Sequence, residues 1–164
     1  MQPAPELAVA PLTREAFAPY GEVIDPGATA QDYAVNEGTA VRFDALANVD
    51  TGAEGGRTVI SIFRAQPRAF PFEVAMLERH PLGSQAFVPL HPALRYIVVV
   101  ADDPAATPRA FLAEGGQGVN YRRGTWHHPL IALDRGGDFL VVDRAGEGGN
   151  CDETRLSQPF RLKL

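Results

Sequence analysis

The sequence predicts an all-β domain, a β-barrel or β-sandwich of about ten strands with one or two short helices. Apolar runs of about 4 to 8 residues alternate with Gly, Pro and Asp clusters, the pattern of short strands joined by turns. The 14 prolines and 16 glycines fall largely between these runs, where they suit turns and would break long helices. With 164 residues, 45% of them hydrophobic, the chain is expected to form a single domain over residues 1–164.

The elements follow in order along the chain. Residues 1–6 are expected to be a loose tail, after which Thr13 caps a short helix that ends at Pro19. Residues 51–56, rich in glycine, are expected to form a loose loop tip. Strands are expected at residues 21–25, 40–44, 58–65, 72–80, 85–90, 95–101, 109–113, 119–121, 129–133 and 139–144.

Charge and cysteine content argue against several classes of protein. The net charge of −5 and the pI near 5.3 disfavour nucleic-acid binding, which depends on an excess of Lys and Arg. The single cysteine, Cys151, cannot form an internal disulfide and fits the reducing cytoplasm, which is the expected location. The longest apolar run, at residues 96–101, is far shorter than the roughly 18 residues of a membrane helix. No signal peptide is recognised, so neither export nor a membrane partner is expected.

A polar cluster within strand-forming sequence predicts a binding or catalytic site. Alternate residues of a strand share a face, so Glu78 and His80 are expected to point together into the mouth of a barrel. Gln85 returns opposite them after a turn, and His127 lies in a second turn that contains Gly124. Because polar groups are costly to bury among apolar side chains, such a cluster points to function.

The spacing of Glu78, His80, Gln85 and His127 resembles the two signature motifs of the cupin superfamily, whose metal ligands meet inside a small β-barrel. Two ligands depart from that pattern, since Glu78 stands at the usual first His and Gln85 at the usual carboxylate. Arg123 also replaces a proline. Two imidazoles, one carboxylate and one amide oxygen remain, a set that fits a divalent metal with fewer nitrogen ligands than usual. A hydrogen-bonded cluster without metal is the other interpretation.

A closer resemblance covers nearly the whole chain. The segments that carry it are PLTREAFAPYGEVID from Pro11, ISIFRAQP, ERHPLGSQAF, GVNYRRGTWHHPL, DFLVVDR and GNCDE. In this order and spacing they resemble the ureidoglycolate lyase family of allantoin and purine catabolism. The resemblance implies a cupin-like β-barrel, usually a homodimer, that splits ureidoglycolate into glyoxylate and urea. It also implies a divalent metal such as Ni²⁺.

The chemistry of ureidoglycolate assigns catalytic candidates. The substrate is a carbinolamide, so its C–N bond breaks when the hydroxyl loses a proton and the departing nitrogen gains one. His80 and His127 are the candidate acid and base, because an imidazole titrates near neutral pH. Glu78 is expected to orient one of them or to act as the base. If a metal is bound, Glu78, His80, Gln85 and His127 become its ligands.

The substrate carboxylate calls for a cation. Arg64 is one candidate, because it shares a face with Ile60 and Ile62, and burial of these isoleucines would carry the guanidinium inside. Arg144 is the other, and either one is equally compatible with a position facing solvent.

Three more residues are candidates for contact with substrate. Gln85 and Tyr121 are expected to bind substrate oxygens, and His128 to line the pocket beside Trp126. For Tyr121, a packed ring with its hydroxyl exposed to water is the other interpretation.

Two other functions remain compatible with these residues. One is a different metal-dependent cupin enzyme, an isomerase or dioxygenase that acts on a small oxyacid. The other is a barrel that binds a small carboxylate without turnover.

Overall fold

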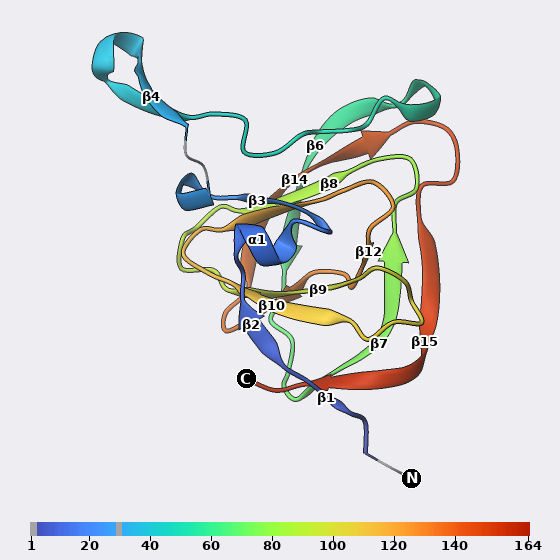
Figure 1. The fold of residues 1–164 in the computed structure, drawn as a ribbon. Coiled ribbons are helices and arrows are strands. Elements are labelled where there is room, and N and C mark those ends of the chain that lie inside the picture. The colour runs from blue at the N-terminus through green and yellow to red at the C-terminus, as the bar shows by residue number, and fades with distance from the viewer. Residues whose placement is uncertain (1–2, 29–30) are drawn as a thin grey trace.

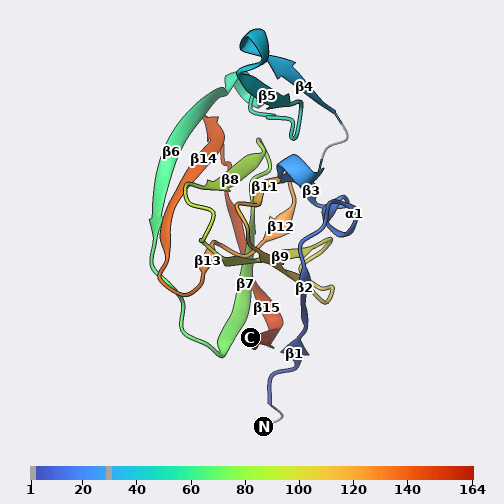
Figure 2. The same cartoon turned by 90° about the vertical axis from the view of Figure 1, so that its left-hand side faces the viewer.

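The computed structural model describes residues 3–28 and 31–164 and confirms the all-β prediction (Figure 1). Within these residues the chain forms fifteen strands, arranged as an eight-stranded sheet, a five-stranded sheet and a separate two-stranded hairpin. The two large sheets pack face to face into a nearly closed barrel, as the view in Figure 2 shows. No helix in the described part of the chain is long and apolar enough to cross a membrane.

The larger sheet builds the wall that carries most of the polar cluster. Its order is β1 (Glu6–Leu7), β15 (Asp152–Leu162), β7 (Phe72–Arg79), β12 (Trp126–His127), β9 (Tyr96–Ala101), β10 (Arg109–Ala113) and β2 (Val9–Pro11), and β13 (Ile131–Ala132) also pairs with β9. The pairings are antiparallel except those of β1 with β15 and of β2 with β10.

The smaller sheet forms the opposite wall. Its order is β3 (Gly21–Ile24), β11 (Gly118–Tyr121), β8 (Gln85–Pro89), β14 (Gly137–Ala145) and β6 (Arg57–Ala65), with every pairing antiparallel. The hairpin of β4 (Asp32–Val35) and β5 (Ala40–Phe43) projects from the body of the domain at the top of both views.

Short helical segments connect some of these strands. Helix α1 (Arg14–Phe17) begins at Thr13 as predicted, and the Thr13 side chain accepts a hydrogen bond from the Ala16 N–H at 3.2 Å. Three 3₁₀ turns complete the set, η1 (Pro26–Ala28), η2 (Asn36–Gly38) and η3 (Ala53–Gly55).

Strand β9 lies at the centre of the fold because both of its faces are buried. Tyr96, Val98 and Val100 pack into the core between the two sheets. Ile97 and Val99 pack into a second core on the far side of the larger sheet, which β1, β7, β13 and β15 cover. A continuous apolar run in the sequence is what such a strand requires, since neither face meets water.

Several predictions of local structure were wrong. Strand β15 was missed because it is half exposed and polar, and because Pro159 lies where its register against β7 shifts. The predicted loose tail is partly a strand, since Glu6 pairs with Arg161, while residues 1 and 2 lie outside the described residues. The predicted turn around His127 is strand β12, and the predicted loose tip at 51–56 contains the buried Thr51 and η3.

Candidate active site

The polar cluster assembles where β7 ends beside β12. The Glu78 carboxylate lies between two histidines, with Oε1 3.4 Å from His127 Nε2 and 3.9 Å from His80 Nε2. Glu78 and His127 face each other in the β7–β12 pairing. Gly124, whose φ is +81°, donates its N–H to the His80 carbonyl at 2.9 Å and so ties the turn before β12 to the end of β7. The structure therefore brings these three predicted residues together.

His127 presents one unoccupied ring nitrogen to this cluster. Its Nδ1 donates to the Thr125 carbonyl at 2.9 Å, so in the neutral ring the lone pair is on Nε2. Nε2 is buried and makes no hydrogen bond of good geometry within the described residues. The Tyr121 ring stacks on the imidazole with centroids 4.1 Å apart and an interplanar angle of 11°. The ring of His127 is thus fixed in orientation and tautomer.

His80 is held between two oxygen atoms. Its Nδ1 lies 2.7 Å from the Asn150 carbonyl, and its Nε2 lies 3.1 Å from Gln85 Oε1. The amide of Gln85 is oriented in turn, because its Nε2 donates to Asp143 Oδ2 at 3.2 Å. A carboxylate accepts but does not donate, so Asp143 directs the amide oxygen of Gln85 toward His80. A series of hydrogen bonds thus runs from the smaller sheet into the site, from Asp143 through Gln85 to His80.

The charge of Glu78 is stabilised by its neighbours. Burial alone would raise the pKa of this carboxyl, but the contact with His127 and the positive charges that His127, His80 and His128 can carry outweigh burial. The net pKa of Glu78 is lowered from its ordinary value. At neutral pH the cluster therefore contains a carboxylate beside two imidazoles.

A pocket of about 580 Å³ opens onto this cluster. Glu78 and Gln85 line one side of it, and Phe63 and Phe87 contribute aromatic rings with centroids 5.5 Å apart. The segment 64–68 also lines the pocket. An apolar cavity of this size with a few convergent polar groups is the usual form of a small-molecule site.

Comparison with known proteins agrees with this geometry. The sequence matches the family described as ureidoglycolate lyase over residues 4–163. The chain belongs to the ureidoglycolate lyase family. A ureidoglycolate lyase from Burkholderia cepacia is 52% identical over 100% of this chain and 94% of its own length. One from Rhizobium etli is 50% identical over 96% of this chain and 95% of its own length.

A third relative and one solved structure complete the comparison. A ureidoglycolate lyase from Pseudomonas syringae pv. tomato is 48% identical over 96% of this chain and 94% of its own. A 3,4-ketoisomerase from Helicobacter canadensis superposes with a TM-score of 0.41 at 13% identity, over 72% of this chain and 80% of the other.

Of the two predicted arginine clamps, Arg64 lines the pocket but its guanidinium is paired with Asp138, and Arg144 is not among the residues that line the pocket. The prediction for Arg64 depended on burial of Ile60 and Ile62, and that premise was wrong, since they are 70% and 52% exposed. Phe63 faces the pocket instead, and Arg64 pairs with Asp138 on the outer face of the sheet. Arg144 is buried, but its guanidinium donates to the carbonyls of Ala53 and Glu147.

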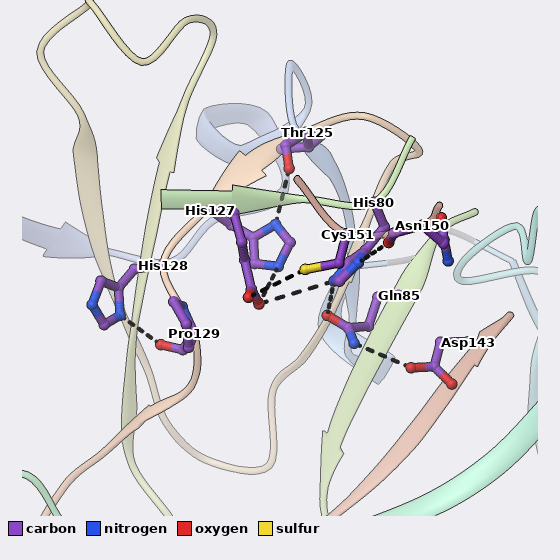
Figure 3. A network of polar contacts seen from close by, with 10 residues as sticks. His80, Gln85, Thr125, His127, His128, Pro129, Asp143, Asn150 and Cys151 are labelled. Carbon is purple, nitrogen blue, oxygen red and sulfur yellow. Dashed lines mark hydrogen bonds and ion pairs between the residues drawn. The ribbon is translucent and has the colours of Figure 1, made fainter. Parts of the chain in front are cut away.

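Tyr121 and His128 have surroundings that differ from the predicted ones. Tyr121 is buried between His127 and the rings of Phe17 and Phe87, and burial raises the pKa of its hydroxyl. His128 points away from the cluster, with Nδ1 2.8 Å from the Pro129 carbonyl and its ring against Phe72 (Figure 3). Burial lowers the pKa of His128, which favours the neutral ring.

Three residues near the site were missed by sequence reasoning. Asn150 and Cys151 belong to the GNCDE segment, and no local pattern indicated that this segment reaches the end of β7. Cys151 Sγ lies 4.0 Å from Glu78 Oε2, and burial followed by nearby carboxylates raises the pKa of the thiol, which opposes thiolate chemistry. Arg68 lies at the pocket rim, outside every predicted strand.

The donor atoms of this family member fit a divalent metal. One donor atom each of Glu78, His80 and His127 lies within 4.8 Å of the others. The buried Nε2 of His127 carries a lone pair without a hydrogen-bond partner in the described residues, as a metal ligand requires. Gln85, also predicted as a ligand, directs its amide oxygen to His80. The donors that fit best are thus two imidazoles and one carboxylate.

Proposed function

We propose that this protein is a ureidoglycolate lyase that converts ureidoglycolate into glyoxylate and urea in the degradation of allantoin. The observation that carries the proposal is the grouping of Glu78, His80 and His127 beside a pocket of about 580 Å³ that Glu78 lines. The names of relatives about half identical over nearly the whole chain supply the substrate. A carboxylate and two imidazoles suit a reaction that consists of two proton transfers.

The reaction is an elimination without added water. The substrate hydroxyl gives up its proton, and the electron pair on oxygen forms the carbonyl of glyoxylate. The C–N bond breaks, its electron pair goes to nitrogen, and a proton delivered to that nitrogen completes urea. One base and one acid are therefore sufficient, each contributing on the order of 10² to 10⁴ in rate.

The hydrogen bonds support an assignment of these two roles. His127 is the base, because its Nδ1 is committed to the Thr125 carbonyl and its Nε2 lone pair has no partner in the described residues. His80 is the acid, because both of its ring nitrogens face oxygen acceptors that favour N–H groups. Glu78 lies between them, with Oε1 3.4 Å from His127 Nε2 and 3.9 Å from His80 Nε2, and its charge stabilises either ring when that ring is protonated, while Gln85 positions His80.

We propose, as an alternative, that the same cluster binds a divalent metal such as Ni²⁺. Glu78, His80 and His127 would hold it. When bound, such an ion would polarise the hydroxyl and carboxylate oxygens of the substrate. The substrate would occupy the same pocket, since Glu78, one of these three residues, lines it.

Purified protein mixed with racemic ureidoglycolate tests the function. We expect glyoxylate and urea in equal amounts without ammonia, measured by a reductase-coupled assay and by a urease-coupled assay with a urease-free blank. Absence of both products, with Ni²⁺ supplied, would remove the lyase function.

The same assay after dialysis against EDTA tests the metal. A rate lost on chelation and restored by Ni²⁺ would require the ion, whereas an undiminished rate would leave the chemistry to the side chains alone.

We propose further that the protein is a cytoplasmic homodimer. Strand β6 is an edge strand, with Ile60 and Ile62 exposed on its outer face, and the projecting hairpin exposes Tyr33, Val41 and Phe43. Contiguous exposed apolar side chains are typical of interfaces. Light scattering of the wild type is expected to give twice the chain mass of 17.7 kDa. The Ile60→Glu variant is expected to give the mass of a single chain. A monomeric wild-type protein would contradict this.

A further inference from the structure

The described pocket contains a carboxylate, so an anionic substrate needs a cation to offset it. We propose that Arg68 binds the carboxylate of the substrate, an inference that rests on the proposed function. Residues 64–68 line the same pocket as Glu78 and Gln85. A carboxylate bound by Arg68 would have its charge offset, with the carbinolamide directed toward the two histidines.

Charge pairing distinguishes Arg68 from the other arginine of this pocket. Arg64 and Arg68 are the two basic residues among those that line the pocket. The guanidinium of Arg64 is held by both oxygens of Asp138, at 2.8 and 3.0 Å, on the outer face of the smaller sheet. Arg68 makes no ion pair and no side-chain hydrogen bond with the described residues. Its five N–H donors are therefore available to a ligand.

The position of Arg68 is fixed by its backbone and by one aromatic ring. Its N–H donates to the Ala132 carbonyl at 2.9 Å, and Pro67 pairs with the same residue, so the rim is attached to the end of β13. The guanidinium carbon lies 5.7 Å from the centroid of the Phe72 ring. A cation over an aromatic face is restricted in orientation while its outer N–H groups stay accessible. Arg68 is thus presented at the rim before substrate arrives.

Arginine suits this task because its planar fork donates two parallel hydrogen bonds to a carboxylate. The two ends of the substrate would then be recognised separately, the carboxylate by Arg68 and the hydroxyl and urea nitrogen by His127 and His80. Arg68 would set specificity for carbinolamides that carry a carboxylate and would take no part in proton transfer.

A pair of substrates tests this assignment. Ureidoglycolate carries the carboxylate, and hydroxymethylurea is the same carbinolamide without it, breaking down to formaldehyde and urea. Arg68→Ala is expected to lower kcat/KM for ureidoglycolate by roughly 10- to 100-fold, the usual effect of losing a hydrogen bond to a charged group. The loss is expected mainly in KM, with kcat/KM for hydroxymethylurea unchanged. Arg68→Lys keeps the charge but not the planar fork of donors. Its kcat/KM for ureidoglycolate is expected to fall between those of the wild type and Arg68→Ala.

The controls separate binding from folding. Arg135→Ala removes an exposed arginine outside this pocket and is expected to behave as the wild type. Unchanged kcat/KM for ureidoglycolate in Arg68→Ala would overturn the proposal. So would an equal loss for both substrates, which would indicate a structural role, or a loss in Arg64→Ala without one in Arg68→Ala.

A binding measurement keeps this inference separate from the proposed function. Calorimetric titration with oxamate, a small unreactive carboxylate, needs no turnover. We expect the wild type to bind oxamate and Arg68→Ala to bind it at least tenfold more weakly. If the wild type did not split ureidoglycolate, the function would fail while this comparison still decided the role of Arg68. Equal oxamate affinity in the two proteins, or no oxamate binding by the wild type, would overturn the proposal that Arg68 binds the carboxylate.

Discussion

His127→Gln is expected to lower the turnover of ureidoglycolate at least a hundredfold while the fold is retained. The wild-type imidazole directs a lone pair on Nε2 into the cluster, because Nδ1 donates to the Thr125 carbonyl. A glutamine amide of similar length can still reach that carbonyl but offers no basic nitrogen. Loss of one base typically costs 10² to 10⁴ in rate. Initial rates of urea release at saturating substrate measure the effect.

The exposed His91 supplies a matched control for this substitution. His91→Gln makes the same chemical change far from the cluster and is expected to retain the wild-type rate. Circular dichroism of both variants establishes that the fold is intact. If His127→Gln turned over ureidoglycolate within threefold of the wild type, the assignment of His127 as base would be wrong.

Arg144→Met is expected to lower the free energy of unfolding by about 2 to 3 kcal/mol while sparing catalysis, as expected for lost hydrogen bonds from a buried charged group. The Arg144 side chain is buried, with Nε and Nη2 donating to the Ala53 carbonyl at 3.1 and 2.9 Å. Nη2 also donates to the Glu147 carbonyl at 2.8 Å. Methionine keeps much of the apolar volume but leaves these two carbonyls without their donor.

Urea denaturation of the wild type and of Arg144→Met measures this loss. The midpoints of the two unfolding curves are compared, with equal m-values as the condition. Arg42→Met is the control, because the Arg42 side chain is 62% exposed in its pair with Asp44 and such pairs contribute little. Its stability is expected to change by less than about 0.5 kcal/mol. An Arg144→Met variant with wild-type stability but a raised KM would instead place Arg144 in substrate binding.

The strand pattern was predictable where apolar runs are continuous or bounded by turn residues, as at β9 and β14. The choice of the buried face was not predictable where a strand lies at the edge of a sheet with both faces largely exposed to solvent. In β6 the sequence offers two apolar sets, and the set containing Ile60 and Ile62 was chosen as the buried one. The contact between Phe63 and Phe87 decides the opposite orientation, and no single-strand pattern contains that information.

The cluster of Glu78, His80 and His127 was predictable because a shared strand face and a short turn motif are local features. The support around it was not. Asn150 contacts His80 across 70 positions of sequence, and Asp143 reaches Gln85 across 58. Such contacts depend on how strands pair across the barrel. The arginine at the rim was missed for a related reason, since residues 66–71 follow no strand pattern.

The series of hydrogen bonds from Asp143 through Gln85 to His80 joins residues of β14 and β8 to the end of β7. The site therefore lies at the boundary between the two sheets. Neither sheet contains a complete site. The chemistry of this protein therefore requires the docking of its two halves in register, in addition to the folding of each.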